Sequence, residues 1–372
     1  MADRYCLHSQ LMNDFIDENF EGIRAPFTAG FELTAKCNLN CVHCYAKPDR
    51  AHQDFTLDEF KEIFDVLVDR GLLDCYFTGG EIFTRPDFED IYVYAKKKGV
   101  MISLLSNITL LDQRHIDLLK EYPVEVISTS MYGYSDNTYE KVTGVKGSYR
   151  KFMNALELLQ NNGIKYELKF VAMEQNIEDL YKVREFGNKL GVPMVVILDV
   201  HPMSDGSLEP VSYRLTPEKA FEFDVQDKGR NQFWKDVAKD LFTGEIQLRP
   251  QRTMQRFSEG YLYPCSIANQ HVFITSDLKM QGCVRASYRK FDLRKGSFDE
   301  GWKYLQKELV DKKSSAMYKC NSCENIRFCE HCVANFMLEN ANEEQVDPFF
   351  CRVAELRHQF VEKEIMRLEK GI

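Results

Sequence analysis

Two kinds of segment alternate between residues 28 and 200, and this alternation restricts the possible folds more than any other feature. Short apolar runs that favour β-strands occur at 28–34, 73–78, 101–106, 124–132, 165–173 and 194–200. Amphipathic helical patterns separate them at 57–70, 86–98, 112–121, 148–162 and 177–190. Four of these helices are expected to stop at a glycine, namely Gly71, Gly99, Gly163 and Gly191. Strands that alternate with helices predict right-handed βαβ units and a parallel sheet.

The chain is therefore expected to have an α/β fold, either a partial barrel or a doubly wound sheet. In both folds, functional side chains gather at the carboxyl ends of the strands. The other expected segments are a short helix and lead-in at 1–27, a connecting segment at 201–260, a cysteine-rich domain at 261–355 and a C-terminal helix at 356–372. Within the connecting segment, helices are expected near 216–223 and 231–242.

Composition excludes several classes of protein. Hydrophobic residues make up 44% of the 372 residues and charged residues 28%, a balance typical of a soluble globular enzyme. The net charge of −9 argues against a protein that tracks a nucleic-acid backbone. The longest aliphatic run, at 194–198, is far shorter than the ~20 apolar residues of a membrane span. With no secretory signal visible, the sequence predicts a cytoplasmic protein without a membrane or nucleic-acid partner.

The twelve cysteines are distributed unevenly, which indicates metal binding. Three of them lie within eight residues, at Cys37, Cys41 and Cys44, and seven others crowd the stretch 265–351. Disulfides are not expected in a reducing cytosol. Of the remaining two, Cys75 lies in an expected strand and is interpreted as a core residue. Cys6 is interpreted as structural or without a role.

The first cysteine group follows the first expected strand. Thiolates at positions i, i+4 and i+7 of one loop can converge on a cubic iron–sulfur cluster and leave one of its irons without a protein ligand. Such an open iron can bind a small molecule directly. Alternatives are a zinc knuckle without its fourth ligand, a ferredoxin-type site completed elsewhere, or a site in which His43 is the fourth ligand.

A second motif, Thr78-Gly79-Gly80-Glu81, stands at the end of the second expected strand. Two glycines allow a backbone to approach a ligand closely, and a carboxylate beside them can accept hydrogen bonds from an ammonium group. The motif is common in loops, but here it lies at the next strand end beside the cysteine loop.

The two motifs together resemble those of the radical SAM superfamily, C-x3-C-x-Φ-C followed by GGE. His43 occupies the usually aromatic position Φ, and Tyr45 follows the motif. The resemblance implies a partial (β/α)6 barrel and a [4Fe–4S] cluster on Cys37, Cys41 and Cys44 whose open iron binds S-adenosylmethionine (SAM). It also implies that Glu81 holds the methionyl ammonium and that the residue at Φ lies against the adenine. One electron would then cleave SAM to methionine and a 5′-deoxyadenosyl radical, which abstracts a substrate hydrogen.

Two later segments resemble further motifs of the same family. Residues 105–107 resemble its TNG motif, which makes Asn107 a candidate SAM contact, although Ile108 stands where glycine is usual. Residues 127–133 resemble its ISLDG-type motif and make Ser130 another candidate contact. Thr78 completes the expected set of cofactor-binding residues.

The C-terminal cysteines resemble the SPASM extension of radical SAM enzymes, a small domain with two auxiliary iron–sulfur clusters. Leu278 stands where that signature has a glycine. The resemblance implies a first auxiliary cluster on Cys265, Cys283 and Cys332, and a second on Cys320, Cys323, Cys329 and Cys351. The first would have an open iron that binds substrate, takes a non-cysteine ligand or is completed by Cys6. The alternative is a zinc ribbon on Cys320, Cys323, Cys329 and Cys332, although its cysteine pairs are closer together than is usual.

Auxiliary clusters suit net oxidations, because a substrate radical becomes a stable product only after it loses or gains an electron. The SPASM resemblance thus implies an oxidoreductase that modifies a ribosomally synthesised peptide or protein, for example by a crosslink or thioether. Alternatives are an enzyme acting on a tetrapyrrole or quinone precursor, a sulfatase-maturating enzyme, or a non-catalytic iron–sulfur electron carrier. Expected partners are the peptide or protein substrate and a reductase such as flavodoxin or ferredoxin. Many peptide maturases of this kind carry an N-terminal leader-binding domain, whereas about 27 residues precede the barrel here, so either a separate protein binds the leader or the enzyme grips its peptide differently.

Asp199 and His201 end the sixth expected strand, where a barrel presents catalytic groups. The alternatives are a helix-capping aspartate and a histidine packed against Pro202. A basic group occurs further along, at Arg285, Arg289, Lys290, Arg294 and Lys295. It is interpreted as a solvated charged face, with attraction of an acidic peptide as the alternative.

Overall fold

The computed structural model describes residues 22–47, 53–244 and 251–370, together with residues 12, 15, 16 and 18–20. Of the N-terminal helix expected within 1–27, the described residues 12, 15, 16, 18 and 19 are helical. Cys6 lies outside the described residues.

The expected alternation of strands and helices is confirmed. The six strands are β1 (Thr28–Thr34), β2 (Asp74–Gly79), β3 (Met101–Leu105), β4 (Ile127–Ser130), β5 (Tyr166–Val171) and β6 (Met194–Ile197). The five expected helices are α2 (Leu57–Asp69), α3 (Phe88–Lys97), α4 (Gln113–Glu121), α6 (Ser148–Asn161) and α7 (Leu180–Leu190). The four glycines that were expected to stop helices all have positive φ. Neighbouring strands from β1 to β6 pair in parallel, as a βαβ chain requires.

One helix of the barrel was not expected. The eight-residue helix α5 (Asp136–Thr143) follows β4, begins at the N-cap Ser135 and ends at Gly144, whose φ is +69°. Its sequence is mostly polar and its length is little more than two turns, so its helical period is weak. The helix matters because its C-terminal end contacts the first cysteine loop.

The sheet continues beyond the six expected strands. Its order is β6-β5-β4-β3-β2-β1-β7-β8-β9, with β7 (His271–Ile274) parallel to β1, and with β8 (Lys279–Gln281) and β9 (Lys290–Asp292) antiparallel. These strands come from the cysteine-rich region, for which little regular structure was expected. Strands of three or four residues are too short to show a two-residue period. The sheet therefore crosses the boundary expected at residue 261.

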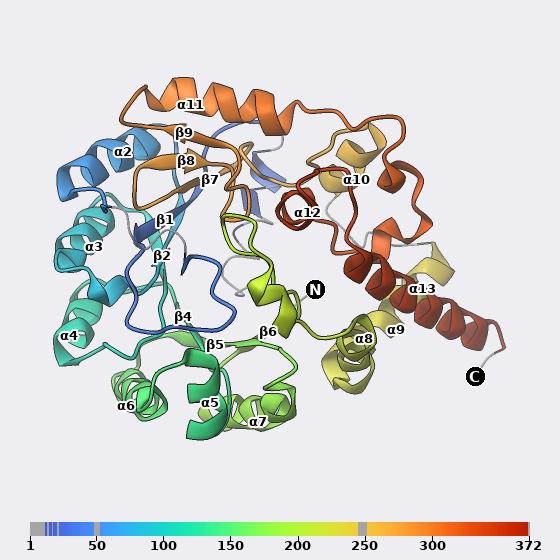
Figure 1. Cartoon of the computed structure of the whole chain (residues 1–372), viewed down its shortest axis with the longest axis horizontal. Coiled ribbons are helices and arrows are strands. Elements are labelled where there is room, and N and C mark those ends of the chain that lie inside the picture. The colour runs from blue at the N-terminus through green and yellow to red at the C-terminus, as the bar shows by residue number, and fades with distance from the viewer. Residues whose placement is uncertain are drawn as a thin grey trace.

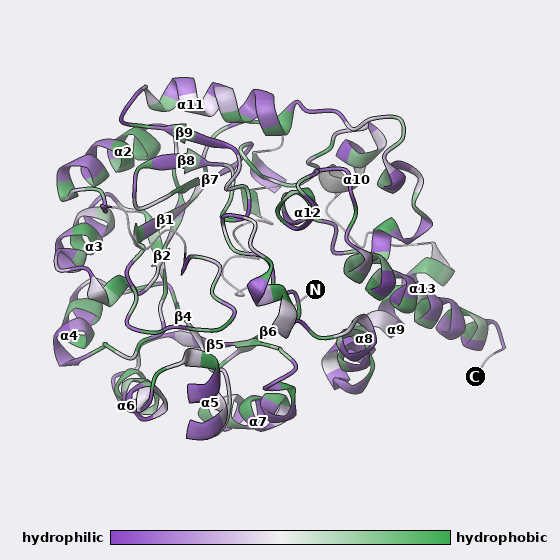
Figure 2. Ribbon diagram, in the orientation of Figure 1, coloured by the Kyte–Doolittle hydropathy of each residue, from purple (hydrophilic) through white to green (hydrophobic). Residues whose placement is uncertain are grey.

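Aromatic side chains from β1, β2 and α2 fill the core between the sheet and its helices. Phe31 lies with its ring centroid 5.2 Å from Phe60 and 6.3 Å from Phe77, and Phe60 lies 5.1 Å from Phe64. All four rings are fully buried. In Figure 2 the helices around the barrel have both hydrophobic and hydrophilic residues, as expected for helices with one buried face.

Helices dominate the opposite side of the molecule (Figure 1). The two helices expected in the connecting segment are present as α8 (Pro217–Gln226) and α9 (Lys228–Thr243). They pack against the long final helix α13 (Pro348–Glu369), which begins eight residues before the expected position. The remaining helices are α10 (Gln251–Ser258), α11 (Phe298–Leu305) and α12 (Val333–Asn340). Within the described residues, no helix combines the length and apolar character needed to cross a bilayer.

Buried ion pairs hold this helical side together. Asp224 of α8 is fully buried and pairs with Arg230 of α9 and, at 2.6 Å, with Arg357 of α13. Arg357 also lies 2.8 Å from Glu330, which follows Cys329. The two arginines hold the pKa of Asp224 below its usual range despite burial. This network joins the connecting segment to the last cysteine group.

Candidate functional site

The first cysteine loop directly follows β1 and is anchored by α5. The backbone N–H groups of Asn40 and Val42 donate to the carbonyls of Thr143 (2.9 Å) and Val142 (3.0 Å). The last carbonyls of a helix have no partner inside that helix, so α5 supplies acceptors that the loop uses. Gly144 caps the helix where an added Cβ would lie 2.8 Å from the carbonyl oxygen of Asn40. The loop is thereby fixed from one side.

Two hydrogen bonds reach the Cys37 thiol. The N–H of Leu39 lies 3.4 Å from Cys37 Sγ, and the side-chain amide of Asn107 lies 3.8 Å from it. The same amide donates to Asn38 Oδ1 at 3.1 Å. Donors aimed at a cysteine sulfur stabilise its thiolate form and tune a metal cluster bound to it. Asn107, which was expected to contact SAM, lies beside the first cysteine.

The glycines of the GGE motif serve a purpose that the sequence did not indicate. The N–H of Gly80 donates to Thr34 O at 2.8 Å, and the N–H of Glu81 donates to Lys36 O at 2.9 Å. A Cβ on Gly79 would lie 2.3 Å from Thr34 O, and one on Gly80 would lie 2.2 Å from Lys36 O. The expected close approach is therefore to the backbone that leads into the cysteine loop.

The Glu81 carboxylate ties the ends of β2 and β3 together. It is almost fully buried and accepts hydrogen bonds from Ser106 Oγ (2.7 Å), the N–H of Asn107 (2.7 Å) and the N–H of Phe83 (3.2 Å), in the short 3-10 helix Ile82–Thr84. Burial raises its pKa to about 7 in spite of these donors. A carboxylate has about four acceptor positions, so these three donors leave room for one more, such as an ammonium.

His43 has a buried nitrogen for which the described residues offer no hydrogen-bond partner. This atom is Nδ1, and the ring packs edge-on to Tyr132 at 5.0 Å. Burial, with a smaller contribution from Lys47, lowers the pKa of His43 to about 4, so the ring is neutral at physiological pH. Ser130, at the end of β4, hydrogen-bonds the Tyr132 side chain. An orphaned buried nitrogen fits a polar ligand atom better than a purely structural role.

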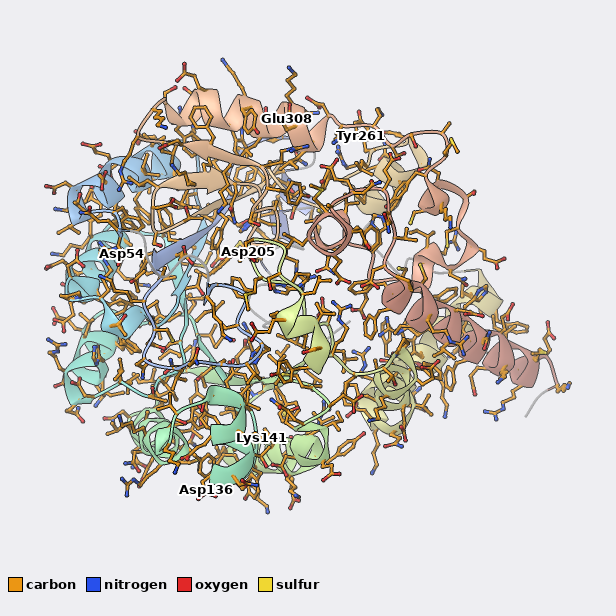
Figure 3. All side chains as sticks on the ribbon, in the orientation of Figure 1. Asp54, Asp136, Lys141, Asp205, Tyr261 and Glu308 are labelled. Carbon is orange, nitrogen blue, oxygen red and sulfur yellow. The ribbon has the colours of Figure 1, made fainter. Side chains whose placement is uncertain are left out.

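The loop after β6 links the first cysteine loop to the C-terminal region. The N–H of Ser204 donates to Tyr45 O at 2.9 Å, and Ser287 Oγ donates to Ser204 O at 2.6 Å. The Tyr45 ring lies 5.2 Å from the ring of His201. This loop runs through the centre of the molecule, where Asp205 is labelled in Figure 3. Thr78 is buried at the end of β2, in register with Glu32 of β1.

Asp199 and His201 lie in the loop that follows β6, because the strand ends at Ile197, earlier than the expected residue 200. His201 Nδ1 lies 3.0 Å from Pro202 O, which agrees with the packing alternative and identifies Nδ1 as the donor, because a carbonyl only accepts. Burial and the Arg285 cation lower the pKa of His201 to about 3. Asp199 does not cap a helix; its carboxylate pairs with Arg285 at 2.7 Å.

The interpretation of the basic group at 285–295 as one solvated face is therefore wrong for Arg285, which is largely buried and paired. Its side chain is 24% exposed, whereas Lys295 is 83% exposed. Arg285 comes two residues after Cys283, which was the available signal for a functional position. Its partner Asp199 is 86 residues away in sequence, so no local pattern could reveal the pair.

The thiols of Cys265, Cys283 and Cys332 lie close enough to influence one another electrostatically. Burial and the nearby Cys332 and Cys265 thiols raise the pKa of Cys283 to about 12. Cys265 is exposed as a residue, yet burial of its thiol and the Cys332 thiol raise its pKa as well. The N–H groups of Arg285 and Ala286 donate to the Cys283 sulfur.

Of the other four C-terminal cysteines, three lie in or beside the 3-10 helices Lys319–Ser322 and Glu324–Phe328, and Cys351 lies in the first turn of α13. Burial and the Cys323 thiol raise the pKa of Cys351. Burial raises the pKa of Tyr318, and the Cys320 thiol and, more weakly, the Cys329 thiol raise it further. Tyr318 is therefore close to both of these cysteines. Cys75 is separate from both groups and fully buried in the barrel core, as expected.

Among the described residues, no three Cys, His, Asp or Glu side chains converge closely enough for a single metal ion. A cubic cluster needs a wider arrangement, because each thiolate binds a different iron.

Comparison with known proteins decides between the interpretations of the first cysteine loop. Residues 31–187, which include the cysteine loop, the GGE motif and β2 to β5, match the radical SAM superfamily. Residues 31–187 therefore form a domain similar to those of the radical SAM superfamily. This family uses a [4Fe–4S] cluster and SAM. The three loop thiols, the orphaned His43 nitrogen and the spare acceptor position of Glu81 fit these two groups.

Proteins similar to this chain are named for different products, a bacteriocin and heme among them. The chain is 34% identical over 170 residues to the antilisterial bacteriocin subtilosin biosynthesis protein AlbA of Bacillus subtilis, a match that covers 44% of this chain and 38% of AlbA. It is 24% identical over 338 residues to the AdoMet-dependent heme synthase of Methanosarcina barkeri, covering 87% of this chain and 96% of that protein. The fold is similar to Streptococcus suis SuiB bound to its precursor peptide SuiA, with a TM-score of 0.68, 14% identity, and coverage of 92% and 80%.

Proposed function

We propose that this radical SAM enzyme performs a net oxidation of a ribosomally synthesised peptide or protein. Cys37, Cys41 and Cys44 would hold the SAM cluster, which together with SAM supplies a radical that removes a hydrogen atom from the substrate. Two auxiliary clusters would be held by Cys265, Cys283 and Cys332, and by Cys320, Cys323, Cys329 and Cys351.

Within this proposal, the residues around the first loop position SAM. Glu81 accepts the methionyl ammonium at its remaining acceptor position, and that cation offsets the burial of the carboxylate. His43 directs its unpaired Nδ1 at the nucleoside, and Tyr45, Thr78 and Ser130 are further proposed SAM contacts. Asn107 acts on the Cys37 sulfur and through its backbone on Glu81.

This proposal rests mainly on the contacts that the loop after β6 makes on its two sides. Hydrogen bonds from Ser204 and Ser287 join it to Tyr45 on one side and to the Cys283 segment on the other. A substrate at the end of β6 would therefore lie between the SAM cluster and the first auxiliary group. There Asp199 and His201 are the proposed catalytic residues. Because Nδ1 carries the ring proton, Nε2 of the neutral His201 can accept a hydrogen bond from a substrate group.

Similarity to AlbA supports a peptide or protein substrate. Co-expression with a candidate precursor peptide tests this, because a net oxidation removes two hydrogen atoms and mass spectrometry detects the loss. The Cys41→Ala variant is the control and should leave the peptide unchanged. An unmodified peptide in cells where the enzyme still cleaves SAM would contradict a peptide substrate. A leader-binding protein and a flavodoxin or ferredoxin are further proposed partners for the same co-expression.

A tetrapyrrole substrate is the second candidate, because the heme synthase relative matches along 87% of this chain. Anaerobic incubation with Fe-coproporphyrin III, SAM and dithionite tests it, since a modified porphyrin would change in mass. The same incubation without porphyrin examines the electron-carrier alternative. Formation of 5′-deoxyadenosine supports the enzyme, and its absence from fully reconstituted protein favours the electron carrier.

A further inference from the structure

An ion pair between Asp199 and Arg285 spans the interface between the barrel and the cysteine-rich region. Arg285 Nη2 lies 2.7 Å from Asp199 Oδ2, and the two side chains are 24% and 19% exposed. Asp199 follows β6, whereas Arg285 belongs to the turn after β8. The pair is therefore a fixed dipole that depends on both parts of the chain.

The positive end of this pair lies beside the first auxiliary cysteine group. Arg285 comes two residues after Cys283, in a turn closed by the N–H of Ala286 on Cys283 O at 3.0 Å. The backbone N–H of Arg285 donates to the Cys283 sulfur, and its guanidinium interacts electrostatically with Cys283 and Cys332. The nearby Arg214 is occupied by Glu339 and Asp347, and His201 is neutral. Arg256 acts electrostatically on Cys265, whereas Arg285 interacts with both Cys283 and Cys332. Arg285 is thus a cation that acts on two of the three thiols of this group.

We propose that the Asp199–Arg285 pair sets the reduction potential of the auxiliary cluster on Cys265, Cys283 and Cys332. Reduction adds one negative charge to a cluster, so a nearby fixed cation favours the reduced state and a nearby carboxylate opposes it. Arg285 raises the potential, and Asp199 limits that rise. The two residues are positioning residues in this respect, because they act through the cluster. The inference rests on the cluster assignment made under the proposed function.

Opposite substitutions give opposite expected shifts. In the reconstituted holoenzyme, Arg285→Gln should lower the midpoint potential by about 59 mV or more, a tenfold change in the one-electron equilibrium constant. Asp199→Asn should raise the potential, and Arg285→Lys should restore it because the charge is kept. A redox titration followed by EPR spectroscopy measures all three, independently of turnover.

The pair Arg294–Glu59 provides a matched control. It joins the same two chemical groups at 2.7 Å, but Arg294 is 41% exposed. Arg294→Gln and Glu59→Gln should leave the potential unchanged.

Shifts of the same sign in Arg285→Gln and Asp199→Asn, or no shift in either, would overturn the inference. A wild-type holoenzyme that gives only two cluster signals, from the SAM cluster and from the cluster on Cys320, Cys323, Cys329 and Cys351, would overturn both the inference and the assignment of a cluster to Cys265, Cys283 and Cys332. A third signal whose potential is the same in all variants would contradict the inference alone. The expected shift of the midpoint potential has a definite direction for each variant. If one variant does not fold, the direction of the shift in the other still tests the inference.

Discussion

The barrel and the helical C-terminal side of this enzyme are stabilised by different interactions. In the barrel, Phe31, Phe60 and Phe77 are fully buried among other apolar side chains. On the C-terminal side, the charged Asp224 and Arg357 are buried just as deeply. Apolar packing tolerates many arrangements, whereas buried charges require specific partners. The fold of the barrel is therefore specified by its pattern of apolar residues, and the packing of the C-terminal side by individual ion pairs.

The largest expected effect separates the two sets of cysteines. Cys41→Ala should abolish formation of 5′-deoxyadenosine and remove about four irons per chain, because the SAM cluster loses a ligand. The double variant Cys323→Ala, Cys351→Ala should also lose about four irons but still cleave SAM. Iron analysis and chromatography of anaerobic reactions measure both quantities. Complete loss of SAM cleavage in the double variant would show that the two regions are not functionally separable.

Next in size are the losses of stability from each type of core. Phe60→Ala should lower the free energy of unfolding by about 3–5 kcal/mol through the cavity it leaves. Arg357→Ala should cost about 3–5 kcal/mol because it leaves Asp224 and Glu330 with a missing cation. Urea unfolding measures the totals, and hydrogen exchange should place the first loss in the barrel and the second in α8, α9 and α13.

Arg367→Ala is the matched control on the same helix. Arg367 pairs with Glu364 but is 62% exposed, so its loss should cost less than about 1 kcal/mol. If Arg357→Ala is equally mild, buried charge does not stabilise the C-terminal side, and the contrast between the regions fails.

A smaller effect should depend on pH and should be confined to the barrel. Burial raises the pKa of Glu81 from its usual 4.5 to about 7, so the folded state without SAM binds a proton that the unfolded state releases. Stability should therefore fall as the pH rises from about 4.5 to 7, by up to about 3 kcal/mol at 1.36 kcal/mol per pH unit. Glu81→Gln should remove this fall in unfolding experiments across the range. An identical pH profile in the variant would mean that Glu81 is ionised throughout.

The smallest effects concern two residues with left-handed backbone, one from each region. Ile108 (φ +53°) is fully buried in the barrel, and Ala341 (φ +54°) is exposed at the end of α12. Ala341→Gly should stabilise the protein by about 0.5–1 kcal/mol, because glycine adopts this conformation without strain. Ile108→Gly should destabilise it by about 1–3 kcal/mol, because lost packing outweighs the relief of strain. Thermal unfolding measures both changes in stability. If the two substitutions change stability in the same direction, packing does not outweigh backbone strain at Ile108 as proposed.

The sequence predicted those parts of the fold that repeat and those parts of the site that follow a spacing. Six strands and five helices of the barrel appear where the periodicity indicated. The thiols of Cys265, Cys283 and Cys332 influence one another electrostatically, and the assignment of the cysteines to clusters stays a prediction. The strands β7 to β9 are too short to show a period. The pair Asp199–Arg285 joins residues far apart in sequence, so only the folded chain reveals it. The motif comparison singled out Ile108 and Leu278, which replace glycines and adopt positive φ, but it did not show the strain.

The place of β1 in the sheet has a consequence for synthesis on the ribosome. One of its edges pairs with β2 soon after both emerge, but the other waits for β7, whose neighbour Gln270 accepts a hydrogen bond from the N–H of Thr28 at 3.0 Å. At about 5–20 residues per second, the intervening chain takes roughly 10–50 s to appear. Throughout that interval the nascent barrel exposes an unpaired strand edge that other chains can join. Slow translation or premature termination before β7 should therefore favour aggregation of this protein.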